Sequence, residues 1–345
     1  ALKDSFAIIG DGRFVRILNI EDPHHPFKVG EYLTSREIYN ILLYDSLALV
    51  LSGNNLVILD ISDPYEPALV SETKITYANA WDMDLEGSML YVLSGSYPNV
   101  GTLTLVNLDD PKSPVVKNKF YVGTNASNIA VHDKVVYVGY VVGWITYFGV
   151  SIVDVQNPDS IKDAGYIDIR DNTPLVAVDD TLLFVGGGSN ARFLKIYSIS
   201  DALNPKELGS IYLGFNNAAD ITDIAVYDHI AYTTTKDSGI FSFDVSDPNR
   251  PSPVGHLRRS FSQEGAYDIT VNGARVAVAS RSGLWLVDAS SLSFLTSAGY
   301  YLTDGSPGPC IINGEYALVA SGASGLSIWD ISDLAKLSRI SALEI

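Results

Sequence analysis

Short apolar runs separated by turn-forming residues fill the chain, and the stretch from residue 38 to residue 75 shows this pattern clearly. Within it, "YNILLYD" alternates apolar and polar residues, "LALVLSG" is almost wholly apolar, "LVILDIS" alternates again and "ALVSETKI" closes the unit. Alternation with a period of two is typical of half-buried β-strands, and no 3.6-residue helical rhythm is visible. The pattern therefore predicts four short strands in this unit.

The same unit returns along the whole chain. The polar residue that ends "LVILD" has an equivalent in every unit: Asn19, Asp60, Asn107, Asp154, Ser198, Asp244, Asp288 and Asp330. These positions are 41 to 47 residues apart, with a mean near 44. Self-similarity at this period marks propellers and solenoids, and four strands per period predict a β-propeller blade. We name the strands of a blade A, B, C and D, from the centre outwards.

Seven equivalent turns support this assignment. The tripeptides "YDS", "EGS", "HDK", "DDT", "YDH", "NGA" and "NGE" each separate two apolar runs at the place where strand A should turn into strand B. Asp, Asn and Gly tolerate the positive φ angles that tight hairpins require. We therefore expect a tight A–B hairpin in each blade.

Counting strands predicts an all-β protein with eight four-stranded blades in a single propeller domain, residues 1–345. Strand C occurs eight times, whereas complete A strands number seven, because Ala1 and Leu2 align with the tail of an A strand. The first blade would thus lack most of its inner strand. Seven blades plus an extra N-terminal sheet is the alternative. The expected blades are approximately 1–37, 38–78, 79–125, 126–172, 173–219, 220–265, 266–306 and 307–345.

The repeated phrase "LVILDISDPYEP" is interpreted as structural. The carboxylate of Asp60 can accept backbone N–H groups of the following turn, as in Asx turns. Asp63 and Pro64 suit a tight turn, and Pro67 can lie where strand D has a free edge. A feature shared by all blades is one that the blade needs to fold, so a specific binding site is expected elsewhere.

This phrase resembles the repeat of the LVIVD-repeat β-propellers, and the resemblance extends over nearly the whole chain. The versions in blades seven and eight, "LVDASSLSF" and "IWDISDLAK", look degenerate. The resemblance implies a propeller common among exported or surface proteins of bacteria and archaea. It brings no catalytic residues with it.

Composition narrows the classes of function. The net charge of −17 argues against nucleic acid as a partner, because nucleic acid attracts basic surfaces. No apolar run approaches the ~18 residues that predict a membrane-spanning helix. The single Cys310 excludes an internal disulfide and any multi-cysteine metal site. Because the sequence starts with Ala1 and not Met, we expect that a leader was removed or that a longer chain precedes it.

The strand order separates two ends of each blade. The A–B and C–D turns fall at one end, and the more variable B–C and D–A loops fall at the other, where binding sites on rigid scaffolds usually lie. The register puts the histidines in A–B turns, a C–D turn or an outer strand, away from the variable loops: His24, His25, His132, His229 and His256. A histidine triad or a histidine-rich metal centre is therefore not expected.

Candidate ligand-binding residues come from the variable loops and from the first position of strand A. Asp82, Asp223 and Asp268 occupy that first position in a mostly polar set, so we expect a rim at the channel mouth that ties strand A to its D–A loop or, alternatively, binds a cation, a sugar or basic side chains. Aromatic and arginine side chains of neighbouring loops complete the set: Trp81, Trp144, Tyr147, Arg258, Arg259 and Tyr267. Cys310 is expected to be a buried apolar residue, not a nucleophile.

Together these features favour a non-catalytic binding module, extracellular or on the cell surface, that recognises protein or carbohydrate through its variable loops. No cofactor is expected, apart from the cation that the carboxylate rim could bind. Two alternatives stay open. One is an enzyme that acts on carbohydrates or polyanions with Tyr, Arg and carboxylate groups at the channel mouth. The other is a structural repeat domain of a surface layer or an adhesion protein.

Overall fold

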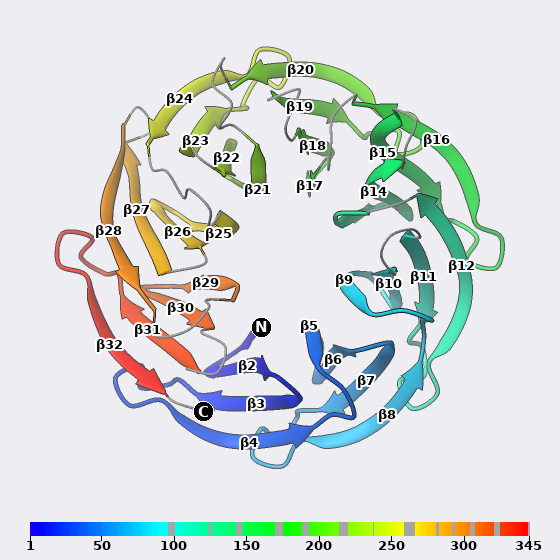
Figure 1. Cartoon of the computed structure of the whole chain (residues 1–345), viewed down its shortest axis with the longest axis horizontal. Helices are drawn as coiled ribbons and strands as arrows, with labels where there is room; N and C mark the ends of the chain where they lie inside the picture. The colour runs from blue at the N-terminus through cyan, green and yellow to red at the C-terminus, as the bar shows by residue number, and fades with distance from the viewer. Residues whose placement is uncertain are drawn as a thin grey trace. The chain divides into compact units, whose positions relative to one another are not determined.

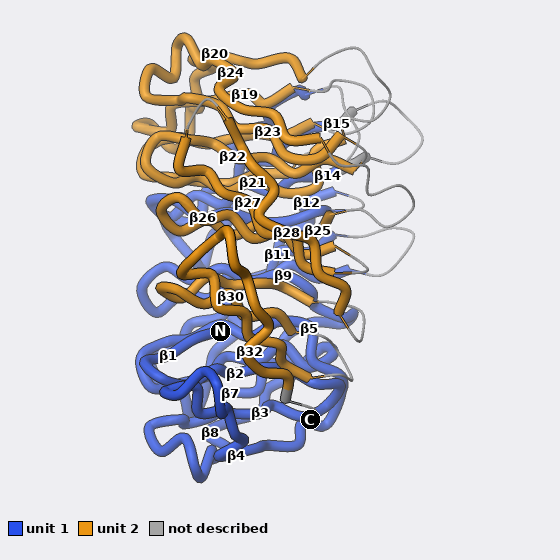
Figure 2. Tube along the Cα trace, turned by 90° about the vertical axis from the view of Figure 1, so that its left-hand side faces the viewer, with its two compact units in different colours: residues 1–174 blue, residues 175–345 orange. Residues whose placement is uncertain are grey.

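The structure is a computed structural model of the chain. It describes residues 1–95, 101–123, 126–142, 147–169, 175–187, 193–213, 220–236, 238–258, 266–280, 283–291, 294–303, 308–320 and 325–343. The chain divides into two compact units, Ala1–Pro174 and Leu175–Ile345, which are coloured separately in Figure 2.

Unit 1 contains four antiparallel four-stranded sheets, each made of four strands consecutive in sequence. In Figure 1 these blades follow one another in chain order. Their strands are β1 (Leu2–Lys3), β2 (Phe6–Asp11), β3 (Phe14–Asn19), β4 (Phe27–Leu33), β5 (Ile38–Tyr44), β6 (Leu47–Ser52), β7 (Asn55–Asp60), β8 (Ala68–Lys74), β9 (Ala80–Glu86), β10 (Met89–Ser94), β11 (Gly101–Asn107), β12 (Val115–Gly123), β13 (Ile129–His132), β14 (Val135–Val142), β15 (Tyr147–Asp154) and β16 (Lys162–Asp168).

Unit 2 contains four more sheets of the same construction. Their strands are β17 (Leu175–Asp179), β18 (Leu182–Gly186), β19 (Phe193–Ser198), β20 (Lys206–Tyr212), β21 (Ile221–Tyr227), β22 (Ile230–Thr235), β23 (Gly239–Asp244), β24 (Ser252–Leu257), β25 (Ala266–Asn272), β26 (Arg275–Ser280), β27 (Gly283–Ser291), β28 (Phe294–Leu302), β29 (Cys310–Asn313), β30 (Tyr316–Ala320), β31 (Leu326–Asp330) and β32 (Ser338–Leu343).

The prediction of an all-β protein with eight four-stranded propeller blades is confirmed, and the seven-bladed alternative is wrong. The first A strand, β1, is only two residues long, and Leu2 and Lys3 pair with Ala7 and Phe6 of β2. No helix of the length and apolar character needed to cross a membrane occurs among the residues described above.

The A–B hairpins form as expected. Each contains a residue with a φ of about +50 to +60°, for example Asp45 at 52° and Gly87 at 60°. The same conformation recurs in every blade, at Asp4, Asp133, Asp180, Asp228, Gly273 and Gly314. Asp and Gly at these positions fold the chain back sharply, and this fixes the register of strands A and B.

The core lies between the faces of neighbouring sheets. Leu49, Leu56 and Ile58 of the second blade pack against Leu90 and Val92 of the third, and all five side chains are fully buried. Because both faces of such a sheet are covered, strands B and C read as nearly continuous apolar runs. Each blade therefore has two free ends where function can reside, the "turn end" with the A–B and C–D turns and the "variable end" with the B–C and D–A loops.

Candidate functional site

In six of the repeated phrases, the turn end is built from two successive Asx turns. In the second blade, Asp60 Oδ1 accepts the N–H of Ser62 at 2.9 Å, and Asp63 Oδ1 accepts the N–H of Tyr65 at 2.9 Å. The first of these turns forms in every blade, with the Ser198 hydroxyl replacing the carboxylate in the fifth. The structural role predicted for Asp60 is therefore confirmed.

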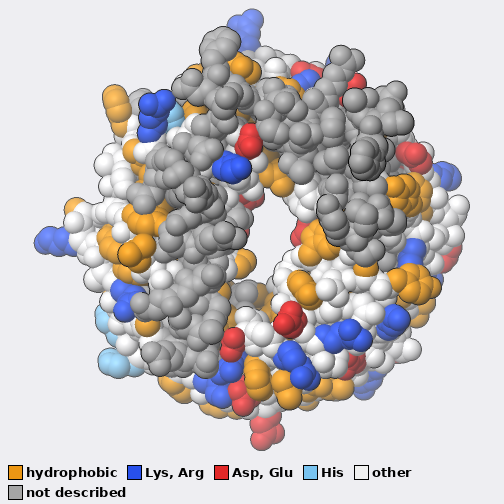
Figure 3. Space-filling model, viewed as in Figure 1, with side chains coloured by type: hydrophobic (Ala, Val, Ile, Leu, Met, Phe, Trp, Pro, Cys, Tyr) orange, Lys and Arg blue, Asp and Glu red, His pale blue; other side chains and the backbone are white. Residues whose placement is uncertain are grey.

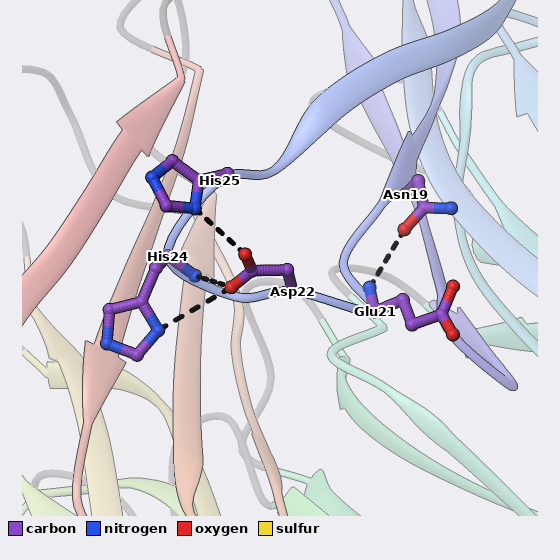
Figure 4. A network of polar contacts seen from close by, with 5 residues as sticks. All are labelled: Asn19, Glu21, Asp22, His24 and His25. Carbon is purple, nitrogen blue, oxygen red and sulfur yellow. Dashed lines mark hydrogen bonds and ion pairs between the residues drawn. The ribbon is translucent and has the colours of Figure 1, made fainter.

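The first blade shows the same arrangement with histidines added (Figure 4). Asn19 Oδ1 accepts the N–H of Glu21, and Asp22 Oδ1 accepts the N–H of His24. His25 Nδ1 lies 2.8 Å from Asp22 Oδ2, and this hydrogen bond lowers the pKa of the Asp22 carboxyl. Both histidines at this turn are used to hold the turn itself.

The repeated phrase also connects a blade to the one before it, at the first and second, the second and third, and the fifth and sixth blades. In every blade, strand D carries a β-bulge at the equivalent position. In the first blade this bulge lies between the pairs Ile17–Gly30 and Leu18–Lys28. A Cβ atom on Gly30 would collide with the carbonyl oxygen of Pro64 in the next blade. The equivalent Ser71 instead donates its hydroxyl to the carbonyl oxygen of Pro111, at 2.7 Å. The phrase therefore packs consecutive blades together.

The predicted rim carboxylates accept hydrogen bonds from the next blade. Asp82 Oδ2 accepts the N–H of Ile129 at 2.9 Å, in strand A of the following blade. Asp223 binds Ile269 N–H at 2.8 Å, and Asp268 binds the N–H of Cys310 at 2.8 Å. We expected such residues to tie strand A to its own D–A loop. Their partners are instead the backbone amides of the neighbouring A strand.

Strand β9 extends this connection along its whole length. Asp84 Oδ2 accepts the N–H of Val131 and Glu86 Oε2 accepts that of Lys134, both at 2.9 Å. Burial raises the pKa of Asp82 from 3.8 to about 6, and it also raises the pKa of Asp84 and of Asp268. These carboxylates thus replace part of a backbone ladder between two blades, which leaves them little capacity for a ligand.

Trp81 lies at a bulge in the pairing of β9 with β10 and packs, partly buried, against a cluster that includes Tyr91 and Ile129. Arg258 follows β24 at the variable end and is exposed. Tyr147 lies in β15 and Tyr267 in β25, but their side chains are outside the described part. Trp144 and Arg259 lie outside the described residues altogether.

Cys310 is buried, and its thiol lies 3.3 Å from Asp268 Oδ2, as a hydrogen-bond donor. Burial, with Asp268 beside it, raises the pKa of this thiol well above its usual value. A thiol held in the protonated state is a poor nucleophile. The geometry therefore agrees with the interpretation of Cys310 as a buried residue, with a hydrogen bond that the sequence did not reveal.

One histidine departs from its expected place. The His256 ring stacks on Phe241 with 3.9 Å between ring centroids, and its Nε2 lies 2.9 Å from the Ser238 carbonyl oxygen. Ser238 belongs to a B–C loop, so His256 does reach the variable end. Among the described residues, no group of three or more His, Cys, Asp or Glu side chains is arranged to hold a metal ion.

Sequence reasoning missed a pocket in unit 1. It is a cavity of about 180 Å³ at the variable end, between the β8–β9 loop and the sheet of the third blade. Its walls are Thr76, Tyr77, Ala78, Ser94, Gly95, Thr102, Thr104 and Lys119. Thr104 is fully buried, and its hydroxyl has no hydrogen-bond partner among the described residues.

Lys119 and Tyr77 line this pocket, and Lys74 lies near the Tyr77 ring. Tyr77 is 88% exposed, and the Nζ atoms of Lys119 and Lys74 lie 4.2 Å and 5.8 Å from the centre of its ring. In Figure 3, basic side chains gather beside hydrophobic ones over the region of β5 to β12, at the lower right of the view. Two of the threonines of this pocket come from the strand C segment "GTLTLVN".

Comparisons with known proteins agree with this fold. The profile of the LVIVD repeat matches residues 40–74 and 305–342, which belong to the second and eighth blades. The eighth blade, whose phrase looked degenerate, is therefore one of the two that carry a recognisable repeat. No curated protein sequence matches the chain.

Solved structures that resemble the chain have low sequence identity to it. The computationally designed Ika8 protein is 10% identical, with a TM-score of 0.74, over 96% of this chain and 95% of that one. BamB from Moraxella catarrhalis is 14% identical, with a TM-score of 0.63 and 96% of each chain covered. A chain of the Mitotic Checkpoint Complex is 13% identical, with a TM-score of 0.60, over 83% of this chain and 84% of that one. These similarities establish the fold alone.

Proposed function

We propose that this LVIVD-repeat β-propeller is a non-catalytic binding module, exported or on the cell surface, that recognises a protein or a carbohydrate through its variable end. The observation that carries the proposal is the contrast between the two ends of the blades. At the turn end the repeated polar groups bond to one another and to the neighbouring blade. At the variable end, polar and aromatic side chains remain available for a ligand.

Exposed side chains of unit 1 support the choice of the variable end. Tyr77 is almost fully exposed, and two ammonium groups lie near its ring. Tyr39, 43% exposed, holds the side chain of Asn79 through its hydroxyl at 2.8 Å. Tyrosines on a rigid scaffold offer a large contact area at a low cost in conformational entropy, so they often dominate protein and sugar recognition.

The described carboxylates and the thiol support a non-catalytic role. A general acid or base must reach the reacting atom with a free oxygen. Asp82 and Asp223 each accept two backbone N–H groups, one from the residue that follows and one from the next blade. Asp268 is engaged by both the backbone and the thiol of Cys310. A binding function needs none of these groups to titrate, and it needs no cofactor.

Among solved structures of similar fold, one belongs to a protein assembly, which fits a binding function. One comparable propeller is a chain of the Mitotic Checkpoint Complex, which is an assembly of several proteins. The net charge of −17 suits a soluble surface that meets cationic or neutral partners. We assign the protein to the exterior of the cell, where LVIVD-repeat propellers are common. Digestion of the protein by a protease added to intact source cells would test that location, and complete protection would contradict it.

The choice of end can be tested with matched pairs of cysteine variants. In unit 1, Asn79→Cys lies at the variable end and Glu66→Cys at the turn end, and both positions are exposed. In unit 2, Arg258→Cys and Arg250→Cys form the equivalent exposed pair. The native Cys310 is buried, so a maleimide reagent will modify the new thiol selectively.

Each variant is coupled to a large polyethylene glycol chain, and binding is measured on glycan arrays and against extracellular proteins. We expect coupling at residue 79 or 258 to reduce binding at least tenfold, and coupling at residue 66 or 250 to leave it unchanged. Loss of binding only on coupling at the turn end would overturn the proposal. Turnover of a carbohydrate or polyanion by the unmodified protein would favour the enzyme alternative.

A further inference from the structure

The pocket at the third blade contains a polar group without a partner. Nearly all buried hydroxyl groups in folded proteins are hydrogen-bonded. Other hydroxyls of this pocket follow that rule, because Thr76 Oγ1 donates to the carbonyl oxygen of Ala78 at 2.6 Å and Ser94 Oγ to that of Thr102 at 3.4 Å. Thr104 is fully buried and lines the cavity, yet its Oγ1 has no partner in the part of the chain that the structure describes. A ligand hydroxyl could supply the missing hydrogen bond.

Equivalent positions in two other blades complete their contacts within the blade. Thr104 pairs across strands C and D with Lys119. In the second blade the corresponding pair is Val57 with Glu72, and Glu72 accepts a hydrogen bond from Asn55 at 2.7 Å. In the sixth blade Phe241 stacks on His256. The Thr104–Lys119 pair of the third blade differs from these two pairs, because the Thr104 hydroxyl has no described partner.

The pocket also carries positive charge, and among the described residues no ion pair joins Lys74 or Lys119 to an acidic side chain. Ion pairs among the described residues use Lys28, Lys117 and Lys195, but neither Lys74 nor Lys119. The two ammonium groups share the Tyr77 ring and repel each other. Burial, and then the charge of Lys74, lower the pKa of Lys119. An anion between the two lysines would relieve this repulsion, and in an acidic protein such a cationic site is unusual.

The size of the cavity limits the ligand. About 180 Å³ is far more than the ~10–15 Å³ that one water molecule occupies by the same measure. Pockets for drug-sized ligands usually reach ~300–1,000 Å³, so this one suits a single small ring and not a long chain. The exposed Tyr77 ring at its mouth offers a flat surface against which such a ring can lie.

We propose that this pocket binds an acidic monosaccharide of the hexuronic acid class, free or at the end of a glycan. Lys119 and Lys74 hold the carboxylate, and the hydroxyl groups of Thr104 and Thr102 bind sugar hydroxyls deeper in the pocket. Tyr77 covers the ring. The inference rests on the proposed binding function and assigns to it a ligand class and a position.

Titration of the intact protein with monosaccharides, followed by protein-observed NMR or calorimetry, tests the ligand class. Galacturonate and glucuronate are the probes, galactose and glucose lack the carboxylate, and acetate lacks the hydroxyl groups. We expect either uronate to bind at least tenfold more tightly than the matching neutral sugar and than acetate. Equal binding of acetate and uronates would overturn the inference, since the site would then recognise only an anion.

Variants with matched controls test the position. Lys119→Gln should weaken uronate binding at least tenfold, whereas Lys195→Gln removes a lysine that is paired with Glu207 and should change nothing. Thr104→Val should weaken binding several-fold. Its control is Thr233→Val, which removes another fully buried hydroxyl without a described partner, outside the pocket. A circular-dichroism melt shows that each variant is folded.

The outcomes separate this inference from the proposed function. If uronates do not bind, but coupling at the variable end still blocks binding of a glycan or a protein, the inference is wrong and the proposed function stands. If uronates bind and Lys119→Gln and Thr104→Val bind as wild type does, the site lies elsewhere and the inference is equally wrong. If coupling at the turn end alone blocks ligands, the proposed function fails as well.

Discussion

The turn end of the second blade and the pocket of the third blade lie in the same unit, yet they use polar residues in opposite ways. At the turn end, Asp60 and Asp63 each accept a backbone N–H, and Gly30 of the first blade leaves room for the Pro64 carbonyl. In the pocket, the hydroxyl of Thr104 and the ammonium of Lys119 lack described hydrogen-bond and ion-pair partners.

This difference shows how a repeat protein can separate stability from recognition. A polar group that recurs in every blade is selected for what the blade needs, and it completes its contacts within the protein. A polar group that occurs once, is buried and has no partner carries a cost in stability that folding does not require. Such a group is a better indicator of a ligand than the repeated phrase is when it also lines a pocket, as Thr104 does.

The largest effect that we expect concerns Asp82, a carboxylate that lies at the variable end but connects blades. Its pKa is raised to about 6 by burial, so its ionised form destabilises the folded state. The stability that protonation gives is present below pH 3.8 and is lost as the pH rises through 6. We expect the difference in unfolding free energy between wild type and Asp82→Asn to rise by up to about 3 kcal/mol from pH 7.5 to pH 4.

Urea unfolding at several pH values gives this difference directly. Asp60→Asn is the control, because Asp60 is only partly buried in an Asx turn and its pKa is lowered, not raised, by the hydrogen bonds with Ser62. A difference for Asp82→Asn that does not change between pH 7.5 and pH 4 would show that Asp82 is a free rim carboxylate and not a buried connector.

A slightly smaller effect should follow from filling the space at the turn end. Gly30→Ala places a Cβ atom against the Pro64 carbonyl of the next blade. Overpacking of this kind costs about 1–3 kcal/mol. Ser71→Ala, at the equivalent bulge, only removes one hydrogen bond to Pro111 and should cost about 1 kcal/mol. Denaturant unfolding measures both, and equal costs would argue against the close contact at Gly30.

A substitution in the pocket should raise the unfolding free energy, whereas the substitutions at the turn end lower it. Thr104→Val removes a buried hydroxyl that has no described partner and keeps the size of the side chain. We expect the unliganded protein to gain about 1 kcal/mol in unfolding free energy, because an unsatisfied buried hydroxyl costs ~1–3 kcal/mol. The comparison is Thr235→Val. The Thr235 hydroxyl donates to the Gly239 carbonyl at 3.0 Å, so this variant should lose stability. A loss of stability in Thr104→Val would mean that its hydroxyl is bonded.

The smallest effect is a pH dependence of ligand binding. Because burial and Lys74 lower the pKa of Lys119, its ammonium loses its proton at a pH below the usual value near 10.4. Uronate affinity should therefore decrease as the pH rises toward 10. In Lys119→Arg it should stay constant, because the guanidinium keeps its charge. Isothermal titration at pH 7, 8, 9 and 10 compares them, and a wild-type affinity that is flat to pH 10 would contradict the role of Lys119.

Much of the fold could be predicted from the sequence because the same strand and turn signals recur in every repeat. Alternating runs indicate strands, and Asp or Gly after strand A indicates a positive φ, as found at Asp45 and Gly87. The Asx turn at Asp60 follows from the same local chemistry. Local signals do not show which groups meet across blades. The bonds of Asp82 to Ile129 and of Ser71 to Pro111 join residues about forty positions apart and were not foreseen.

The pocket was missed for a related reason. Thr104, Lys119 and Tyr77 are each ordinary for a strand or a loop, and only the cross-strand pairing and the β8–β9 loop bring them together. The candidate residues chosen from the sequence were instead selected because their side chains are aromatic or charged. Trp81 packs against a core cluster and Asp82 binds a neighbouring strand, so their chemistry is largely used inside the fold.

One measurement tests the central claim most directly, which is that recognition lies in the polar groups that do not repeat. Backbone amide NMR shifts of the isotope-labelled protein are followed during a titration with galacturonate. We predict that the largest shifts fall on Tyr77, Gly95, Thr102 and Lys119 around the pocket, with no change at the Asx turns. Shifts concentrated on the turn residues from Asp60 to Pro67 would contradict the account, because they would place recognition in the repeat itself.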